Sequence, residues 1–379
     1  MRAEPGPRSR PIRLRRARSV GTMTDDRWHV RAVALPDGAE PVDWWVAGGR
    51  LTARPVDGAH DVPGGWVAPG LVDAHVHLTF ETHDRLGLER ATQRLVAAQL
   101  AQQLRAGVLA VRDAGSLPGV PLEAEPPGGG RVIGCGPFVA PPGLFPAHLC
   151  DATRASDVIE AARAHVRAGW PWVKVIADYP GEDGNALAPD VGYPLELLVE
   201  IAAAVHEEGG LIAAHVMGRL VREIVHAGLD SIEHGNWATE DTVQEMAARG
   251  TAWTPTLTTM LRYIEPLADD VPPARALLDL QRRTLPLAAE AGVTLLAGTD
   301  EEPHGTVAAE VAALVRYGTP VRDAIAAAST GARRFLGLPA LEEGAPADLV
   351  TFDRDPRDDL AALGQPVAVI AGGRLVAPA

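Results

Sequence analysis

APGLVDAHVHL, at residues 68–78, ends in two histidines separated by one residue, His75 and His77. The residues from 67 to 72 are typical of a turn followed by a short apolar strand. Alternate side chains of a strand point to the same side, so the two imidazoles converge on one point. Neutral imidazole is the commonest protein ligand for a transition metal. The stretch therefore predicts part of a metal site, whose other ligands must follow later in the chain.

The composition is that of a globular protein with room for one large α/β domain and a smaller second domain. Of the 379 residues, 46% are hydrophobic and 22% are charged. The formal net charge is −14 and the isoelectric point is about 5.3, which argues against nucleic acid or an anionic membrane as the main partner. A neutral or cationic small-molecule substrate is favoured instead, and a homo-oligomer is left open.

Cysteine usage and hydropathy indicate a cytoplasmic protein. Cys135 and Cys150 form neither a disulfide framework nor a CxxC metal motif. No apolar run is long enough to span a bilayer. Residues 1–22 are rich in arginine and lack the apolar segment and cleavage site of a secretory signal. We expect them to be a disordered basic tail or a mis-assigned start, with translation beginning at Met23, and in both cases to lie outside the fold.

The two ends of the chain have matching strand character. Short strands separated by Gly, Pro and Asp turns are predicted at residues 30–35, 41–46 and 48–51, and again at 347–352 and 366–376. Both ends contain the sequence Gly-Gly-Arg-Leu. We therefore expect residues 23–67 and 345–379 to pair into one composite β-sandwich domain.

Between these ends, apolar strands alternate with alanine-rich helices. Strands are expected at 107–112, 172–176, 211–215, 231–234, 252–255 and 293–297, and helices at 86–105, 155–168, 194–208 and 307–317. This alternation predicts a parallel sheet, and its length favours a (β/α)8 barrel of the TIM type over residues 68–344. In such barrels the chemistry lies at the carboxyl ends of the strands.

Lys174 lies inside the otherwise apolar strand WVKVI at 172–176. A charged lysine is costly to bury, so it either reaches the barrel rim or pairs with an acid such as Asp178. The alternative is a deprotonated amine that carries a carboxyl group taken from CO2 and bridges two cations. On its own, the residue favours the structural alternative.

Three more polar residues close predicted strands. His215 ends LIAAH, His234 ends SIEH, and Asp300 ends VTLLAGTD. Each alone is compatible with a structural role, such as a core histidine or a helix N-cap aspartate. Barrel geometry brings neighbouring strand ends together, however, and the joint pattern favours a metal centre.

The six residues together suit two divalent ions. Imidazoles with a few oxygen donors favour Zn²⁺, with Mn²⁺, Fe²⁺ and Co²⁺ as alternatives. Two such ions lower the pKa of a shared water and polarise a substrate carbonyl. Asp300 is then placed to accept the proton of the water and pass it to the leaving group, so Asp300 and Lys174 are the predicted catalytic residues.

Residues 45–379 resemble the amidohydrolase superfamily, and within it the imidazolonepropionase-like and Xaa-Pro or Xaa-Arg dipeptidase-like branch. The resemblance rests on motifs shared along the chain: PGLVDAHVHL at 69–78, VRDAG at 111–115, WVKV at 172–175, AH at 214–215, AGLDSIEHG at 227–235, GTD at 298–300 and APADLV at 345–350. It implies a metal-bearing barrel with a terminal β-sandwich. It further implies that His75, His77 and Asp300 hold one ion and that His215 and His234 hold the other, with N6-carboxylated Lys174 between them.

Three further residues are candidate substrate contacts. His148 stands in Pro-Ala-His where the relatives usually have Gly-Gly-His, Tyr179 follows the Lys174 strand, and His304 follows Asp300. Tyr179 is suited to donate a hydrogen bond to a substrate carbonyl. Glu301 and Glu302 either start a helix or, if they face the site, favour a cationic substrate group. Arg112 and Asp113 are expected to form a structural pair near the barrel mouth.

The resulting hypothesis is a metal-dependent hydrolase of C–N amide bonds, acting on a dipeptide, an N-acyl amino acid or a cyclic amide by attack of a hydroxide shared between the ions. Hydrolytic deamination of a heterocycle is the first alternative, and Lys174 counts against it because the resembling mononuclear deaminases lack this lysine. Lactone hydrolysis at the same site is the second alternative. A metal-binding scaffold without catalysis is disfavoured, since none of the six ligands is missing.

Overall fold

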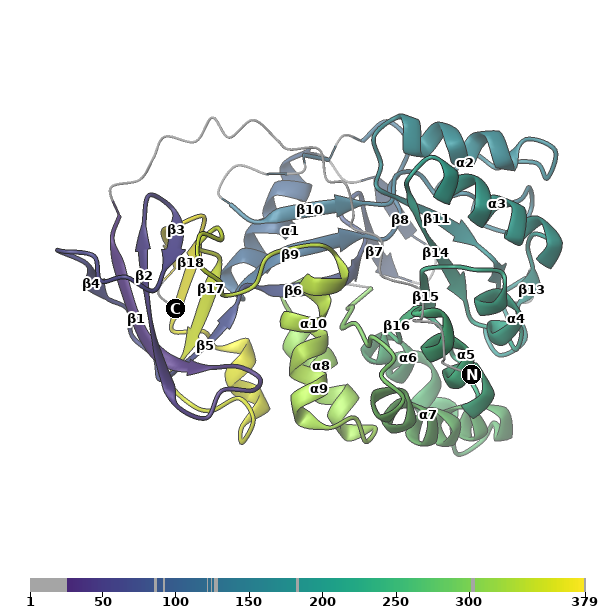
Figure 1. Ribbon diagram of the computed structural model, residues 1–379. Coiled ribbons are helices and arrows are strands. Elements are labelled where there is room, and N and C mark those ends of the chain that lie inside the picture. Colours follow the sequence, from purple (N-terminus) through teal and green to yellow (C-terminus); the bar gives the residue numbers. More distant parts are fainter. Residues whose placement is uncertain are drawn as a thin grey trace, which may run out of the picture.

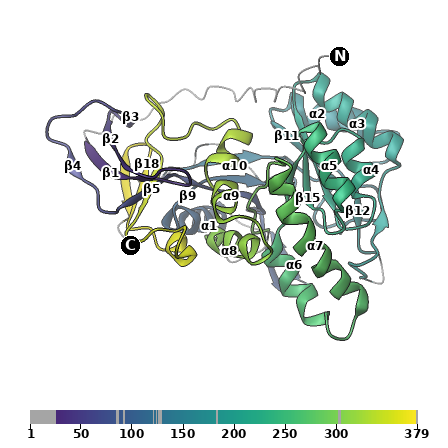
Figure 2. The same cartoon turned by 60° about the horizontal axis from the view of Figure 1, so that its bottom comes forward.

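The computed structural model describes residues 26–377 except 85–86, 91–92, 121, 124, 126–128, 182–183 and 301–303, and of residues 81–84, 87–90 and 377 it describes the backbone alone. The strands of a barrel occupy the centre of the molecule, and a separate sheet stands at one end (Figure 1). Helices cover the outside of the strands (Figure 2). Among the described residues, no helix combines the length and the apolar character that crossing a membrane requires.

Eight parallel segments form the barrel. Seven are strands: β6 (Leu71–Val76), β9 (Val108–Asp113), β10 (Arg131–Gly134), β11 (Trp172–Ile176), β14 (Leu211–Val216), β15 (Ser231–His234) and β16 (Ala252–Thr254). The eighth is the segment 293–300, which bridges β16 through Trp253 and Leu295 and bridges β6 through Val76 and Asp300. A bridge between Val139 and Val175 joins the β10 side to β11. The barrel is therefore closed, and the predicted (β/α)8 fold is confirmed.

Ten helices are described in the same part of the chain: α1 (Gln93–Arg105), α2 (Val158–Arg167), α3 (Leu195–Glu207), α4 (Val221–His226), α5 (Glu240–Arg249), α6 (Leu257–Ile264), α7 (Pro272–Glu290), α8 (Val307–Arg316), α9 (Val321–Ala327) and α10 (Thr330–Phe335). Helix α3 shows why they pack outside the strands. Its buried residues Leu198, Ile201, Ala202 and Val205 recur at helical spacing and form one apolar stripe facing the sheet.

Two predictions of elements were wrong. The helix expected at 86–105 begins at Gln93, because Gly87–Arg90 (β8) instead pairs antiparallel with Phe80–Asp84 (β7). Strand β10 was not predicted, since a run of four residues is too short to show a period. A further short pair, β12 (Asp178–Tyr179) with β13 (Asp190–Val191), extends beyond the end of β11.

Both chain ends contribute to one eight-stranded sheet. The strands are β1 (Trp28–Ala34), β2 (Pro41–Ala47), β3 (Arg50–Thr52), β4 (His60–Asp61), β5 (Trp66–Pro69), β17 (Leu349–Phe352), β18 (Ala368–Ala371) and β19 (Arg374–Ala377). Strand β5 joins the two ends, because it pairs parallel with β1 and antiparallel with β17. The purple and yellow strands accordingly lie side by side in Figure 1. The predicted β-sandwich from both termini is confirmed.

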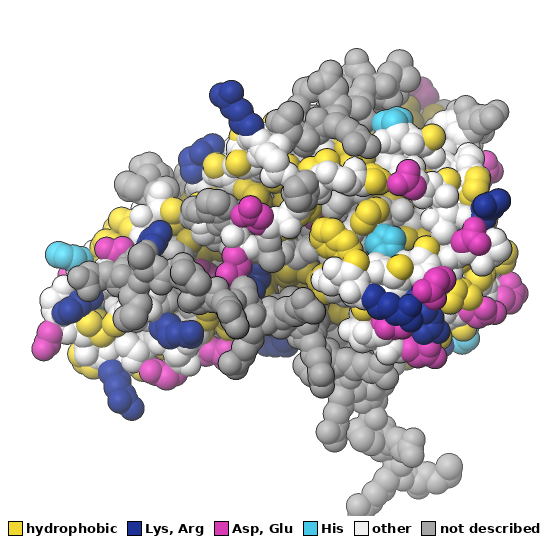
Figure 3. Space-filling view, turned by 90° about the horizontal axis from the view of Figure 1, so that it is seen from above, with side chains coloured by type: hydrophobic (Ala, Val, Ile, Leu, Met, Phe, Trp, Pro, Cys, Tyr) yellow, Lys and Arg dark blue, Asp and Glu magenta, His cyan; other side chains and the backbone are white. Residues whose placement is uncertain are grey.

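Charged side chains are spread over the surface. On the face seen from above in Figure 3, acidic and basic side chains stand among apolar ones. Several of the basic groups are paired: Arg167, for example, contacts Glu208 at 2.6 Å and Glu160 at 2.9 Å. Charges of both signs therefore share this face.

Both cysteines are expected to be unreactive while the protein is folded. Burial raises the pKa of Cys135 to about 12 and that of Cys150 to about 11, so the reactive thiolate is scarce at neutral pH. An aromatic disulfide reagent with a chromogenic product, added at about pH 8, should label neither thiol in native protein and both in guanidinium chloride. Rapid labelling of both thiols in the native state would contradict the burial described here.

Candidate metal centre and active site

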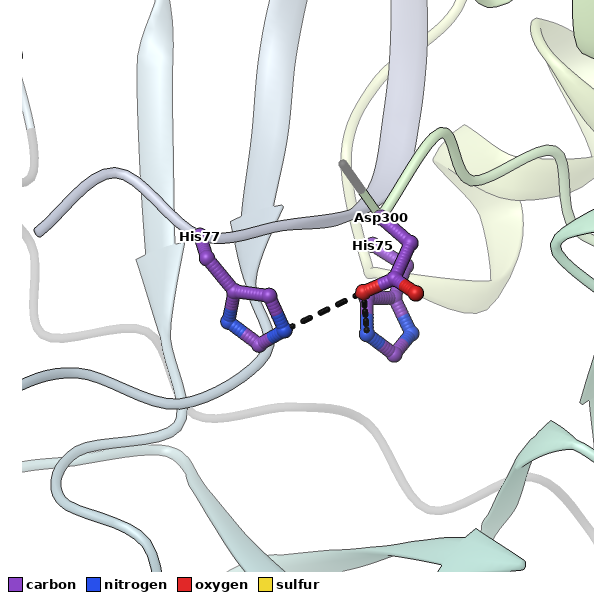
Figure 4. A group of neighbouring side chains, drawn as sticks. All are labelled: His75, His77 and Asp300. Carbon is purple, nitrogen blue, oxygen red and sulfur yellow. Dashed lines mark ion pairs between the residues drawn. The ribbon is translucent and has the colours of Figure 1, made fainter. Parts of the chain in front are cut away.

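Strand β6 and the end of the segment 293–300 bring three ligands together. The Nε2 atoms of His75 and His77 each lie 3.3 Å from Oδ1 of Asp300 (Figure 4). The backbone N–H of Asp300 donates to the carbonyl of His75 at 2.7 Å, which ties the aspartate to the strand. Asp300 also has a positive φ of 62°, an uncommon conformation for a residue other than glycine. The backbone therefore turns at Asp300 and directs the carboxylate toward the histidines.

These distances suit a common ion better than direct hydrogen bonds. Two ligand atoms at typical Zn–N and Zn–O lengths around a tetrahedral ion stand roughly 3.4 Å apart. In addition, Nε2 of His75 is buried and has no hydrogen-bond partner among the described residues. A buried polar atom without a partner is costly, and a cation at this point would satisfy it. His75, His77 and Asp300 thus form a metal site.

The other ring nitrogen of His75 and of His77, Nδ1, already has a hydrogen-bond partner. Nδ1 of His75 lies 2.6 Å from Oε2 of Glu233, and Nδ1 of His77 lies 3.1 Å from the carbonyl oxygen of Gly115. In the neutral tautomer each Nδ1–H donates, and each Nε2 keeps its lone pair for a metal. A carboxylate or carbonyl behind a ligating histidine is the usual way to fix the tautomer.

Glu233 belongs to a buried ion pair that the sequence analysis missed. Arg112 donates to Glu233 at 2.6 Å, and both side chains are fully buried. Burial opposes ionisation of Glu233, but Arg112 and His75 hold its pKa well below the usual range. The expected pairing of Arg112 with Asp113 was wrong, because Asp113 instead accepts from the backbone N–H of Leu78 at 2.8 Å and from Ser116 at 2.7 Å. The sequence did contain a signal for this ion pair, because an arginine and a glutamate each stand inside an otherwise apolar strand.

His215 and His234 come together on neighbouring strands. Nδ1 of His215 lies 2.9 Å from Nε2 of His234, and Nδ1 of His234 contacts the hydroxyl of Thr256 at 2.8 Å. Burial lowers the pKa of His234 to about 3 and also places the pKa of His215 well below its usual value. Both imidazoles are therefore neutral at physiological pH, as metal ligation requires.

Lys174 is buried at the same end of the barrel, with 1% of its side chain exposed. It is the only lysine in the chain. Burial lowers the pKa of its amine. Asp178 does not pair with it, and accepts instead from the backbone N–H groups of Met217 at 2.6 Å and Gly218 at 2.8 Å. The structure thus contradicts both structural alternatives for Lys174, the exposed rim and the pair with Asp178.

A cavity of about 700 Å³ opens above these residues. Five of the six predicted ligands border it: His77, Lys174, His215, His234 and Asp300. Tyr179 and His304 also line the cavity, whereas His148 is exposed and does not. His304 is 6% exposed, and neither of its ring nitrogens has a partner among the described residues. Glu301 and Glu302 lie outside the described residues.

Gly298 maintains the position of His75. A Cβ atom at Gly298 would lie 2.5 Å from Cβ of His75 and 2.7 Å from Cγ2 of Thr254. Gly298→Ala should therefore lower the free energy of unfolding by about 1–3 kcal/mol and weaken metal binding, because overpacking shifts the ligand strand. Urea denaturation and zinc titration would measure the two effects. Gly65→Ala is the matched control, since its Cβ meets nothing within 4 Å, and equal behaviour of the two variants would contradict this role.

Comparison with known proteins places this geometry in a family. The amidohydrolase family model matches residues 66–376. An uncharacterized protein of Mycobacterium tuberculosis is 35% identical over 387 residues, covering 98% of both chains. Ochratoxinase of Aspergillus niger is 29% identical over 267 residues, covering 65% of this chain and 55% of that enzyme.

A solved structure with a similar fold is a Xaa-Pro dipeptidase with methionine bound in its active site. The two folds superpose with a TM-score of 0.75 at 20% identity, covering 92% of this chain and 99% of the dipeptidase chain. The fold, the histidine–aspartate metal site and the family match agree with one another, and the predicted resemblance is confirmed. The chain belongs to the amidohydrolase family, as a metal-dependent hydrolase.

Proposed function

We propose that this protein cleaves a C–N amide bond in a dipeptide, an N-acyl amino acid or a cyclic amide, with two divalent ions, of which Zn²⁺ suits the ligands best. The observation that carries the proposal is the convergence of two imidazole pairs, Asp300 and Lys174 at one end of the barrel, where five of these six side chains border one cavity. Dipeptidases and ochratoxinase among the similar proteins are consistent with amide hydrolysis.

The residues divide into two ligand sets. His75, His77 and Asp300 would hold one ion, and the facing nitrogens of His215 and His234 would hold the other. Lys174 would serve both as a carbamate, formed when its neutral amine adds to CO2 and releases one proton. Burial favours the neutral amine that this addition needs. Since Lys174 is the only lysine, every other basic side chain of the protein is arginine or histidine and cannot form this carbamate.

The bound ions would lower the pKa of a water and polarise the substrate carbonyl. Asp300 is placed to accept a proton at its carboxylate and deliver it to the leaving amine, because its second oxygen is not required by the two histidines. His304 and Tyr179 are placed to orient the amide as hydrogen-bond donors from the cavity wall. His148 stays a prediction without support from its exposed position.

The test is a hydrolysis screen of chelator-treated protein before and after reconstitution with Zn²⁺ or Mn²⁺. Dipeptides, N-acyl amino acids, lactams and lactones are assayed for bond cleavage, and purines, pyrimidines and guanidines are assayed for ammonia release. We expect amide cleavage that depends on the added metal. Ammonia release without amide cleavage would favour the deaminase alternative, and lactone opening alone would favour a lactonase.

A further inference from the structure

Aromatic rings form a continuous arc along one wall of the cavity, from one ligand set to the other. His77 contacts Phe138 with ring centroids 5.5 Å apart, and Phe138 contacts Phe145 at 5.0 Å. Phe145 packs edge-on against Tyr179 at 4.8 Å, and Tyr179 reaches His215 at 5.5 Å. All five rings line the cavity. A group attached to an amide carbonyl at the metal ligands would therefore lie against this arc.

The remainder of the described lining is also mainly apolar. Met217, Met260, Ile264 and Leu267 border the same space. The charged residues in the described lining are Lys174 and Asp300, both at the end of the cavity that holds the metal ligands. Phe145 and Tyr179 are only partly buried by protein, so their rings have surface left to offer a ligand.

We propose that the natural substrate carries a large apolar, preferably aromatic, group next to the scissile amide, and that Phe138, Phe145 and Tyr179 bind it. The inference rests on the proposed function and specifies its substrate class. Aromatic groups bury much apolar area and pack favourably edge-on or offset against other rings. A cationic substrate group finds no acid in the described lining other than Asp300, which the metal site already uses.

The experiment compares amides that differ in one group. N-acetylglycine is compared with N-(2-naphthylacetyl)glycine, and N-methylacetamide with N-(2-naphthylmethyl)acetamide, on Zn²⁺-loaded protein, so that a methylene group separates each ring from the amide. In at least one pair the naphthyl compound should have a kcat/KM roughly 10- to 100-fold higher, as expected for burial of an aromatic group. A ratio near one, or a preference for the small compounds, in both pairs would overturn the proposal.

Phe145→Ala tests the wall itself. It should reduce the naphthyl preference by about 10-fold while leaving the metal content unchanged, because it removes apolar contact area away from the ligands. The control is Phe335→Ala: Phe335 is also partly buried, but it packs against Trp172 at 5.7 Å and does not line the cavity. The control should leave the ratio unaltered, and an unaltered ratio in Phe145→Ala would contradict the assignment.

Calorimetric binding of the same amides to metal-free protein separates this inference from the proposed function. Tighter binding of the naphthyl compounds, weakened in Phe145→Ala, would support the aromatic site even if none of the amides were hydrolysed. Hydrolysis of the small amides with no naphthyl preference would instead retain the proposed function and refute the aromatic site.

Discussion

Lys174→Ala is expected to abolish amide hydrolysis, with a loss of at least about 10³-fold in kcat/KM. The substitution removes the only amine that is both buried against the ligands and able to carry a carboxyl group. In the proposed two-metal centre, the ions would then lack the anionic group that Lys174 would supply, and their mutual repulsion would be less compensated. Steady-state hydrolysis of the best amide from the screen, together with metal content, would measure the effect.

Added carboxylates provide the control for this variant. Formate or acetate should partly restore activity to Lys174→Ala, because a small carboxylate can occupy the space left by the side chain and supply the missing oxygens. Lys174→Arg should not respond, since a guanidinium fills that space with a permanent positive charge. Full activity of Lys174→Ala without additive would remove the carbamate from the mechanism.

Glu233→Gln should lower the metal affinity by about 10- to 100-fold, because the residue fixes His75 from behind. It should also lower the free energy of unfolding by about 3–5 kcal/mol, since Arg112 would lose the one carboxylate that it pairs with among the described residues. Competition with a zinc chelator and urea denaturation would measure the two effects.

Glu310→Gln is the matched control for Glu233→Gln. Glu310 is equally buried, but it accepts from the backbone N–H groups of Leu257 at 2.7 Å and Thr258 at 2.8 Å, at the start of α6. Loss of the Glu310 carboxylate should lower the free energy of unfolding but change the metal affinity by less than 10-fold. If Glu233→Gln bound zinc as tightly as the wild type, its positioning role would be refuted.

The convergence of the candidate ligands could be predicted because each one lies in an apolar strand or close to its carboxyl end. Parallel strands that close into a barrel bring their carboxyl ends to one edge, so His75, His77, His215, His234 and Asp300 required no knowledge of side-chain contacts. Strand β10 and the hairpin of β7 with β8 could not be predicted in the same way. Their pairing depends on neighbours, and a four-residue run carries too little periodicity.

The residues that position the candidate ligands could not be predicted, because they contact those ligands from distant parts of the chain. Glu233 and His75 are separated by 158 residues, and the sequence contains no sign that they touch. For Lys174, the sequence left a rim position or a pair with Asp178 open. The structure decides against the rim position because Lys174 is buried, and against the pair because the Asp178 carboxylate instead accepts from the backbone N–H groups of Met217 and Gly218. The loop that carries His148 shows the reverse case, a motif position whose side chain is exposed and does not line the cavity.

The most direct test of the two-metal account is the metal content of active protein. Protein produced in zinc-supplemented medium and assayed for amide hydrolysis should contain about two ions per chain, and its activity should rise with metal added to chelator-treated protein until two equivalents are bound. Active protein that contains no divalent ion, or full activity at a single equivalent, would contradict the account.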